Sequence, residues 1–489
     1  MITRLKIDGF KNLVGVDVSF GPFTCIAGPN GVGKSNIFDA IQFLSALADV
    51  SLIAAASGVR GDAGGAFATD IFTRTAHGPS KEMSFLVEMI VPDQVMDDYD
   101  QVVRPTSRHL RYELSVQHQT EPSEKVPRLL ITKESLTHLN KSDAGERLPW
   151  ARTCKTWLKS TFTEKSRSSA YISTEEREGA VFFKLHEDSG HQGRTLARGS
   201  SPTPRTALSS VNTKEYPTVM AAKRELQSWR ILQLEPSKLR QPSEWNEPSS
   251  LGRDGSHLAA TAQRILNSRE ELESGAVAAR LSSRLFGLIG EVKMIGVDED
   301  EVRRTYTVVA SGTDGIRYRA RELSDGTLRF LALAVLERDP AWSGLVCMEE
   351  PENGIHPLRI PAILDLLRSI ALDPKYPLGK DNPLRQVILS THSPLVVDRI
   401  PEDSLVMVLP WKVEMEDGAW VPCASYRSLE YTWRARAGAA VIPKGEILSY
   451  LGTMQPDLRK MPKEEMLVGQ REDILEGLGL FMAAEEPAG

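Results

Sequence analysis

A phosphate-binding loop is the most specific chemical signal in this sequence. Residues 28–35 read GPNGVGKS, which places two glycines, a lysine and a serine at the spacing GxxxxGK[ST]. In such a loop the backbone N–H groups surround a polyphosphate, the lysine reaches the terminal phosphates and the hydroxyl binds Mg²⁺. Lys34 and Ser35 are therefore candidates for phosphate and Mg²⁺ binding, against the alternative of a plain glycine turn. Further candidate nucleotide contacts are Asn30, Gly31, Val32, Gly33 and Asn36.

Two carboxylates follow a short apolar run further along the chain. Residues 344–357 read GLVCMEEPENGIHP. Carboxylates at the end of a buried strand are costly unless a cation or hydrogen-bond donors meet them there. We expect Glu349 to hold Mg²⁺ through water and Glu350 to polarise the attacking water as a general base. The alternative is an exposed acidic turn after an edge strand.

A histidine ends the next apolar run. Residues 385–394 read RQVILSTHSP, so His392 follows a predicted strand and two hydroxyl residues. A histidine at that place could sense or stabilise the terminal phosphate, because its charge changes near neutral pH. A histidine that is merely hydrogen-bonded at a strand end is the alternative.

The segment 322–329, ELSDGTLR, precedes a strong apolar helical pattern. Ser324 is a good helix-capping residue and Gly326 permits close approach, so this helix start could accept an anion. Ser324, Asp325 and Gly326 are candidate contacts, with an ordinary capped helix as the alternative.

The periodicity of apolar residues indicates the elements that must position these segments. A short apolar run predicts a strand at 23–27 that leads through the loop into a helix beginning near residue 34. Alternation predicts further strands, and helical spacing predicts two further helices. The strands are expected at 2–7, 14–20, 83–91, 110–118, 128–132, 291–297 and 304–310, and the helices at 219–232 and 257–289.

Composition excludes several classes of protein. The chain has 489 residues, 41% of them hydrophobic and 25% charged, as in globular proteins. Its net charge of -6 gives no global reason to bind nucleic acid or an anionic membrane. The sequence shows neither a signal peptide nor an apolar run long enough to span a bilayer, so we expect a cytoplasmic protein. The four cysteines are widely spaced, which predicts neither a disulfide framework nor a zinc site.

Taken in order, the four segments resemble the core of ABC-type ATPases. They are similar to the RecF/SMC branch, and more closely to the standalone bacterial ATPases grouped with the OLD family, which often serve in genome maintenance or phage defence. The matching stretches cover about residues 1–45 and 320–400. They read MITRLKIDGFKNL, GPNGVGKSN (Walker A), LSDGTLRFLALA (signature helix), MEEPENGIHP (Walker B) and ILSTHSP (switch histidine).

This resemblance implies a head that hydrolyses ATP, with Mg²⁺, as a homodimer or higher even-numbered oligomer. Each nucleotide would lie between one Walker A loop and the signature residues Ser324, Asp325 and Gly326 of the opposite subunit. The resemblance also implies nucleotide contacts at Lys11 and Asn12. One departure is Glu349, which stands where the family usually has aspartate.

The expected fold class is α/β, an ABC-type P-loop ATPase head with a mixed α+β insertion domain. The two halves of the head are expected at 1–92 and 321–410, the insertion at 93–320 and a C-terminal extension at 411–489. Within the insertion, the polar stretch 151–216 predicts an irregular loop or surface. No DxD cluster follows the switch histidine, so no nuclease activity is assigned to this chain.

Two hypotheses for what the ATPase drives remain open. Residues 151–255 hold 17 basic and 12 acidic residues, which could form a DNA contact surface or a solvated face of mixed charge. Residues 401–489 hold 9 basic and 15 acidic residues, and apolar positions at 466–481 could form a docking helix for an effector protein such as a nuclease, or cover the core. A transporter subunit is disfavoured, because the signature reads LSDGT instead of LSGGQ.

Overall fold

The computed structural model describes residues 1–59, 68–119, 127–162, 169–178, 180–189, 193–197, 204–268, 276–290, 292–415, 418 and 420–452. Residues Met1–Pro443 form one compact unit, and the described part of a second unit is helix α14 (Lys444–Gly452). The docking helix predicted near residues 466–481 lies outside the described residues.

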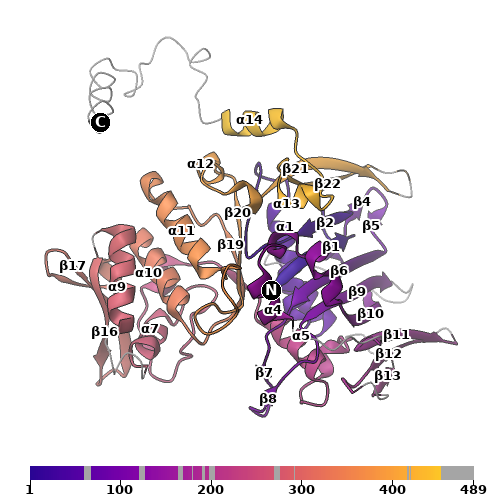
Figure 1. The fold of residues 1–489 in the computed structure, drawn as a ribbon, viewed down its shortest axis with the longest axis horizontal. Coiled ribbons are helices and arrows are strands. Elements are labelled where there is room, and N and C mark those ends of the chain that lie inside the picture. Colours follow the sequence, from indigo (N-terminus) through magenta and orange to yellow (C-terminus); the bar gives the residue numbers. More distant parts are fainter. Residues whose placement is uncertain are drawn as a thin grey trace, which may run out of the picture. The chain divides into compact units, whose positions relative to one another are not determined.

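A six-stranded sheet carries the segments with predicted chemistry (Figure 1). Its order is β14-β19-β20-β3-β21-β22; the first five strands are parallel and β22 is antiparallel to β21. The strands are β3 (Phe23–Ala27), β14 (Arg230–Leu232), β19 (Gly344–Glu349), β20 (Arg385–Thr391), β21 (Leu405–Glu414) and β22 (Trp420–Ser428). Every residue of β3 and β20 is buried, as expected for strands covered on both faces. The carboxyl ends of β3, β19 and β20 therefore meet at one edge.

An antiparallel sheet of eight strands forms the second layer, in the order β13-β12-β11-β10-β9-β6-β1-β2. Its strands are β1 (Ile2–Asp8), β2 (Val16–Ser19), β6 (Glu82–Ile90), β9 (His109–Gln119), β10 (Arg128–His138), β11 (Ile172–Arg177), β12 (Ala180–Leu185) and β13 (Thr195–Ala197). Side chains of helix α1 (Lys34–Ala46) share one hydrophobic core with residues of both sheets. Phe43 of α1, for example, packs against Phe85 of β6 with ring centroids 5.6 Å apart.

Helices and a small sheet accompany the end of the parallel sheet at β14 and β19. The helix α10 (Asp325–Arg338) contacts α9 (Ala276–Ile289) and α11 (Ile360–Ile370). The small sheet contains β15 (Ser243–Glu244), β16 (Val292–Asp300), β17 (Thr305–Gly312) and β18 (Arg317–Arg319), with α7 (Leu258–Leu266) packed on it. The remaining short elements are α2 (Leu52–Ser57), β4 (Arg74–Thr75), β5 (Gly78–Pro79), β7 (Val95–Met96), β8 (Val102–Val103), α3 (Ala144–Arg147), α4 (Lys155–Thr161), α5 (Pro217–Gln227), α6 (Pro236–Leu239), α12 (Pro394–Val397) and α13 (Trp433–Arg436).

The predicted mixed α/β fold is confirmed, while three local predictions need correction. The helix expected at 257–289 is not continuous, because α7 ends at Leu266 with Asn267 as its C-cap and α9 begins only at Ala276. The helix expected at 219–232 ends at Gln227, because residues 230–232 pair with β19 as strand β14. The polar stretch 151–216 is not irregular throughout. It contains α4 and the strands β11, β12 and β13, whose exposed edge of the sheet tolerates polar residues.

The region 93–320 shares its sheets with both predicted halves of the head. Strand β6 precedes residue 93 and pairs with β9, which follows it, and β14 from the same region pairs with β19. Residues 93–320 therefore contribute strands to both main sheets within the unit Met1–Pro443.

Candidate functional site

The phosphate loop connects β3 directly to α1, as the sequence predicts. The Lys34 side chain is buried, with 7% of the residue exposed, and its Nζ donates to the carbonyls of Gly28 and Pro29 at 2.8 Å each. Burial lowers the pKa of Lys34, while the nearby carboxylates Glu350 and Glu349 oppose that shift. The loop thus holds the Lys34 ammonium group at the edge of the sheet where the acidic residues also lie.

The crest and the flank of the loop have different surroundings. Asn30 and Gly31 are exposed, Ser35 and Asn36 are half-buried, and the Val32 side chain lies in the hydrophobic core. The exposed crest and the first turn of α1 could offer backbone N–H groups to a phosphate and the Ser35 hydroxyl to Mg²⁺. The Val32 side chain instead anchors the loop.

Asn12 supports the loop from the segment between β1 and β2. Its Nδ2 donates to the Val32 carbonyl at 3.0 Å, and its Oδ1 accepts from Asn36 Nδ2 at 2.7 Å. Gly33 has a φ of 99°, and a Cβ there would lie 2.2 Å from Asn12 Nδ2. Asn12 therefore packs where only glycine leaves room.

The neighbouring Lys11 points its charge toward helix α1. Its Nζ lies 2.8 Å from Oδ2 of Asp39, whose side chain is only 2% exposed. In this structure both residues predicted to touch nucleotide, Lys11 and Asn12, make these contacts with the Walker A loop and the helix that follows it.

The acidic residue Glu350 lies beside the switch histidine across β19 and β20. Glu350 N donates to the Ser390 carbonyl at 2.8 Å, and Oε1 lies 2.6 Å from His392 Nδ1. Because an ionised carboxylate only accepts hydrogen bonds, Nδ1 is the donor and Nε2 is left for another partner. Glu350 also has a φ of 46°, an uncommon backbone conformation for a non-glycine residue and one found at functional sites.

A second contact holds the other oxygen of Glu350. Asn353 Nδ2 donates to Glu350 Oε2 at 2.6 Å, and the Asn353 carbonyl accepts a hydrogen bond from Arg329 of α10. The signature helix is thereby connected to the predicted general base of the same chain.

The signature segment begins α10 as a capped helix. Ser324 is the N-cap, and its Oγ accepts from Thr327 N at 3.2 Å. Arg240 fixes the segment by donating to the Leu323 carbonyl at 3.1 Å and to Asp325 Oδ1 at 2.5 Å. Ser324 and Asp325 are exposed and Gly326 is half-buried, so this helix start is accessible to a partner.

The residues predicted to bind Mg²⁺ lie at this edge of the sheet. The charges of Glu350, Glu349 and Glu352 act against the lowering of the Lys34 pKa by burial, so these carboxyl groups lie near its ammonium. Carboxylate and hydroxyl oxygens are the donors that Mg²⁺ prefers. Ser35 and Glu349 would hold the ion, and its charge would offset the excess of carboxylates.

Several residues of this site were missed by the sequence analysis. They contact the predicted residues or one another, and are Asp39, Arg240, Arg329, Glu352, Asn353 and Thr391. Glu352 and Asn353 adjoin the predicted carboxylates in MEEPEN, and the side-chain types alone could have suggested them. The two arginines lie far from the motif residues they contact, so no local pattern identifies them.

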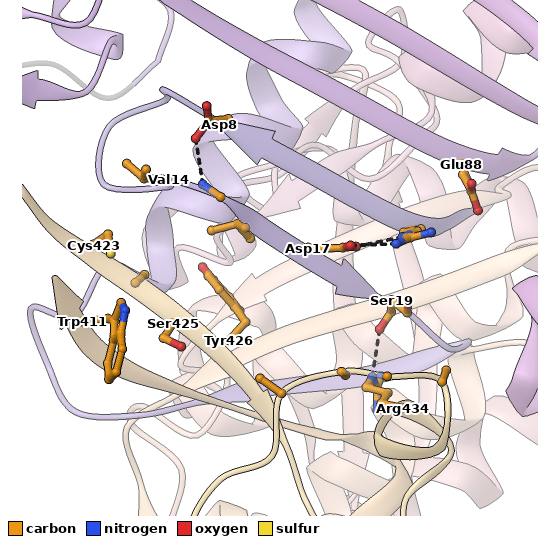
Figure 2. Close-up of a pocket in the computed structure, with 18 of the residues that line it drawn as sticks. Asp8, Val14, Asp17, Ser19, Glu88, Trp411, Cys423, Ser425, Tyr426 and Arg434 are labelled. Atoms are coloured by element: carbon orange, nitrogen blue, oxygen red, sulfur yellow. Dashed lines mark hydrogen bonds and ion pairs between the residues drawn. The ribbon is translucent and has the colours of Figure 1, made fainter. Parts of the chain in front are cut away.

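A separate cavity of about 1030 Å³ lies behind the segment that carries Asn12. Figure 2 shows Asp8, Val14 and Asp17 on one side, and Trp411, Cys423 and Tyr426 of the β21–β22 hairpin on the other. Asp8 Oδ1 accepts from Gly15 N at 2.8 Å, and Ala424 N donates to the Asn12 carbonyl at 3.1 Å. These contacts hold the β1–β2 segment in place from the side opposite the phosphate loop.

Comparison with protein families identifies one match. The family described as "AAA domain, putative AbiEii toxin, Type IV TA system" matches residues 23–123 and 221–398. These two ranges make up more than half of the chain and include the Walker A, signature, Walker B and switch-histidine segments. A search of the curated proteins finds no match.

Solved structures of SMC heads are also similar to this chain. A head bound to the C-winged helix domain of ScpA has 15% identity and a TM-score of 0.44, and the match covers 88% of this chain and 98% of that one. A head with an extended coiled coil from Pyrococcus furiosus, bound to the C-terminal domain of ScpA, has 14% identity and a TM-score of 0.44 over 89% and 98%. The SMC head from Thermotoga maritima has 12% identity and a TM-score of 0.35 over 88% and 99%. Among the described residues of the present chain, no helix is long and apolar enough to cross a membrane.

Proposed function

Because the chain belongs to this AAA-domain family of P-loop ATPases, we propose that it binds Mg–ATP and hydrolyses it between two heads. The observation that carries the proposal is the contact of 2.6 Å between Glu350 and His392 at the sheet edge that also holds Lys34. A phosphate loop, a candidate base and a candidate phosphate sensor thus share one edge.

The residues would divide the reaction as follows. Lys34 exchanges its hydrogen bonds to the loop carbonyls for hydrogen bonds to the phosphates of ATP. There its buried positive charge stabilises the negative charge of the transition state. Glu350 orients water and accepts its proton, and a protonated His392 donates from Nε2 to an oxygen of the terminal phosphate. Mg²⁺, when held by Ser35 and Glu349, supplies charge neutralisation across the phosphates.

The exposed signature segment supports action as a dimer. Ser324 and Asp325 are exposed at the start of α10, and Arg240 holds them in position. In a head-to-head dimer these residues would contact the nucleotide of the other subunit. ATP binding would then close the dimer and hydrolysis would open it.

Steady-state ATP hydrolysis across protein concentration tests this proposal. Specific activity should rise with concentration, because each site needs a second chain. Lys34→Ala should lose nucleotide binding, whereas Glu350→Gln should bind ATP, stop turnover and accumulate a dimer. Normal turnover by Glu350→Gln would refute its assignment as the base.

We propose that the ATPase cycle is coupled to DNA or to a separately encoded effector protein, in phage defence or DNA repair. One observation favours a second candidate, an ATP-gated scaffold with little turnover. Both carboxylate oxygens of Glu350 already accept a hydrogen bond, from His392 and from Asn353, so a water molecule must compete for the lone pairs that remain on them. Stimulation of ATP hydrolysis by duplex or single-stranded DNA would favour the DNA-coupled ATPase, and slow turnover indifferent to DNA would favour the scaffold.

A further inference from the structure

Glu352 is a buried carboxyl group that the proposed reaction does not use. Only 8% of Glu352 is exposed, and its Oε2 has no hydrogen-bond partner in the part of the chain that the structure describes. Burial raises the pKa of Glu352, and the neighbouring charge of Glu350 acts in the same direction. A group this costly to bury is retained only where its remaining contacts matter.

A hydrogen bond of the Glu352 side chain leads to the end of the switch-histidine strand. Thr391 is fully buried, and its Oγ1 donates to Glu352 Oε1. The same Oγ1 accepts from Ser393 N at 2.9 Å. The Thr391 carbonyl accepts from Gly28 N, the first residue of the phosphate loop, at 3.3 Å. Thr391 therefore joins the Walker A loop, the Walker B turn and the switch histidine.

These contacts fix the backbone on both sides of His392. The hydroxyl of Thr391 holds Ser393 N, so the turn that carries His392 is closed by a single side chain. Glu352 sets the direction of that hydroxyl, because its carboxyl oxygen takes the only hydroxyl proton. Without this acceptor the hydroxyl is free to rotate and the turn is less restrained.

We propose that Glu352 is a positioning residue for ATP hydrolysis, which orients the Thr391 hydroxyl and so aims His392 at Glu350. The proposal rests on the proposed ATPase function. It assigns Glu352 no contact with substrate, and it requires an acceptor at this position but no negative charge.

Four single variants and one double variant separate this role from simple packing. Glu352→Ala and Thr391→Val remove the hydrogen bond and should each lower kcat about tenfold, as expected for loss of one well-aligned contact in the transition state. ATP affinity should stay within about twofold, because Lys34 and its loop are unchanged. Glu352→Gln and Thr391→Ser keep an acceptor and a hydroxyl and should restore kcat. The double variant Glu352→Ala/Thr391→Val should be no slower than either single variant.

A matched control removes a buried threonine hydroxyl elsewhere. Thr261 is fully buried, and its hydroxyl donates to the His257 carbonyl at 2.8 Å. Thr261→Val should leave kcat unchanged. An equal loss of kcat in this control would mean that the effect is general destabilisation, and a low kcat for Glu352→Gln would mean that the carboxylate charge itself is needed. Either result would overturn the proposal.

A spectroscopic readout keeps this test independent of turnover. The ring resonance of His392, assigned by its loss in His392→Gln, should shift or broaden in Glu352→Ala and return in Glu352→Gln. An unchanged resonance in Glu352→Ala would refute the positioning role even if ATP were hydrolysed. Absence of hydrolysis by the unaltered chain would instead refute the proposed function, and the His392 resonance would still decide the role of Glu352.

Discussion

Replacing Asn12 with alanine should weaken nucleotide binding through the loss of its contacts with the Walker A segment. Asn12 makes two side-chain hydrogen bonds to the Walker A segment, at 3.0 Å to the Val32 carbonyl and at 2.7 Å from Asn36. Each such bond contributes about 0.5 to 1.5 kcal/mol, so their loss costs about 1 to 3 kcal/mol of preorganisation. At tenfold per 1.4 kcal/mol, we expect the Kd of ATP to rise about 5- to 150-fold.

The choice of ligand separates support of the Walker A loop by Asn12 from a direct contact of Asn12 with the adenine of ATP. A loop that is less well formed binds every polyphosphate less tightly, so ATP, GTP and inorganic triphosphate should be weakened by the same factor in Asn12→Ala. A direct contact with adenine would weaken ATP alone. Calorimetric titration of the three ligands measures both quantities.

Asn12→Asp provides a matched variant. The carboxylate still accepts from Asn36 Nδ2 but cannot donate to the Val32 carbonyl, so we expect an intermediate loss. Unchanged ATP affinity in Asn12→Ala, or a loss confined to ATP, would refute the reasoning from loop support.

Three further predictions concern stability and the signature segment. Burial raises the pKa of Glu134 to about 7. The stability that its protonation adds to the folded chain is therefore fully present below about pH 4.5 and is lost as the pH rises through 7. Glu134→Gln should flatten the fall of Tm between these two pH values. Gly28→Ala should lower the free energy of unfolding by about 1 to 3 kcal/mol in denaturant titrations, because its Cβ would lie 2.3 Å from the carbonyl oxygen of Val408. Arg240→Ala should slow ATP hydrolysis while ATP binding is kept, because it frees Asp325 and the signature segment; unchanged kcat would contradict this.

The sequence predicts the parts of the site whose geometry is local. The loop between β3 and α1 was predicted because an apolar strand, the glycine spacing and a helix occur consecutively within about 25 residues. Glu350 and His392 were each predicted to follow a short apolar strand, and the parallel pairing of β19 with β20 then brings them together at one edge.

Contacts between distant segments could not be predicted in this way. Arg329 reaches Asn353 and Arg240 reaches Asp325 only because α10 packs beside both segments, and nothing in either local pattern specifies a partner. Lys11 and Asn12 were predicted to contact nucleotide from the family resemblance alone; their contacts with Asp39 and with the loop itself are not specified by any local pattern. Strand β14 escaped detection because three residues after a helix carry too little periodicity.

The order of strands in the parallel sheet also determines when the site can form during synthesis. Strand β3 lies between β20 and β21, so the strand that carries the phosphate loop has no sheet neighbour until residues 385–391 and 405–407 have been made. At about 5 to 20 residues per second, the ribosome needs roughly 20 to 75 s to make the chain between β3 and β21. A nascent or truncated chain therefore carries a complete GxxxxGKS sequence without a sheet to hold it. Premature termination before β20 should give a chain that chaperones and proteases recognise, in place of a partial ATPase that sequesters nucleotide.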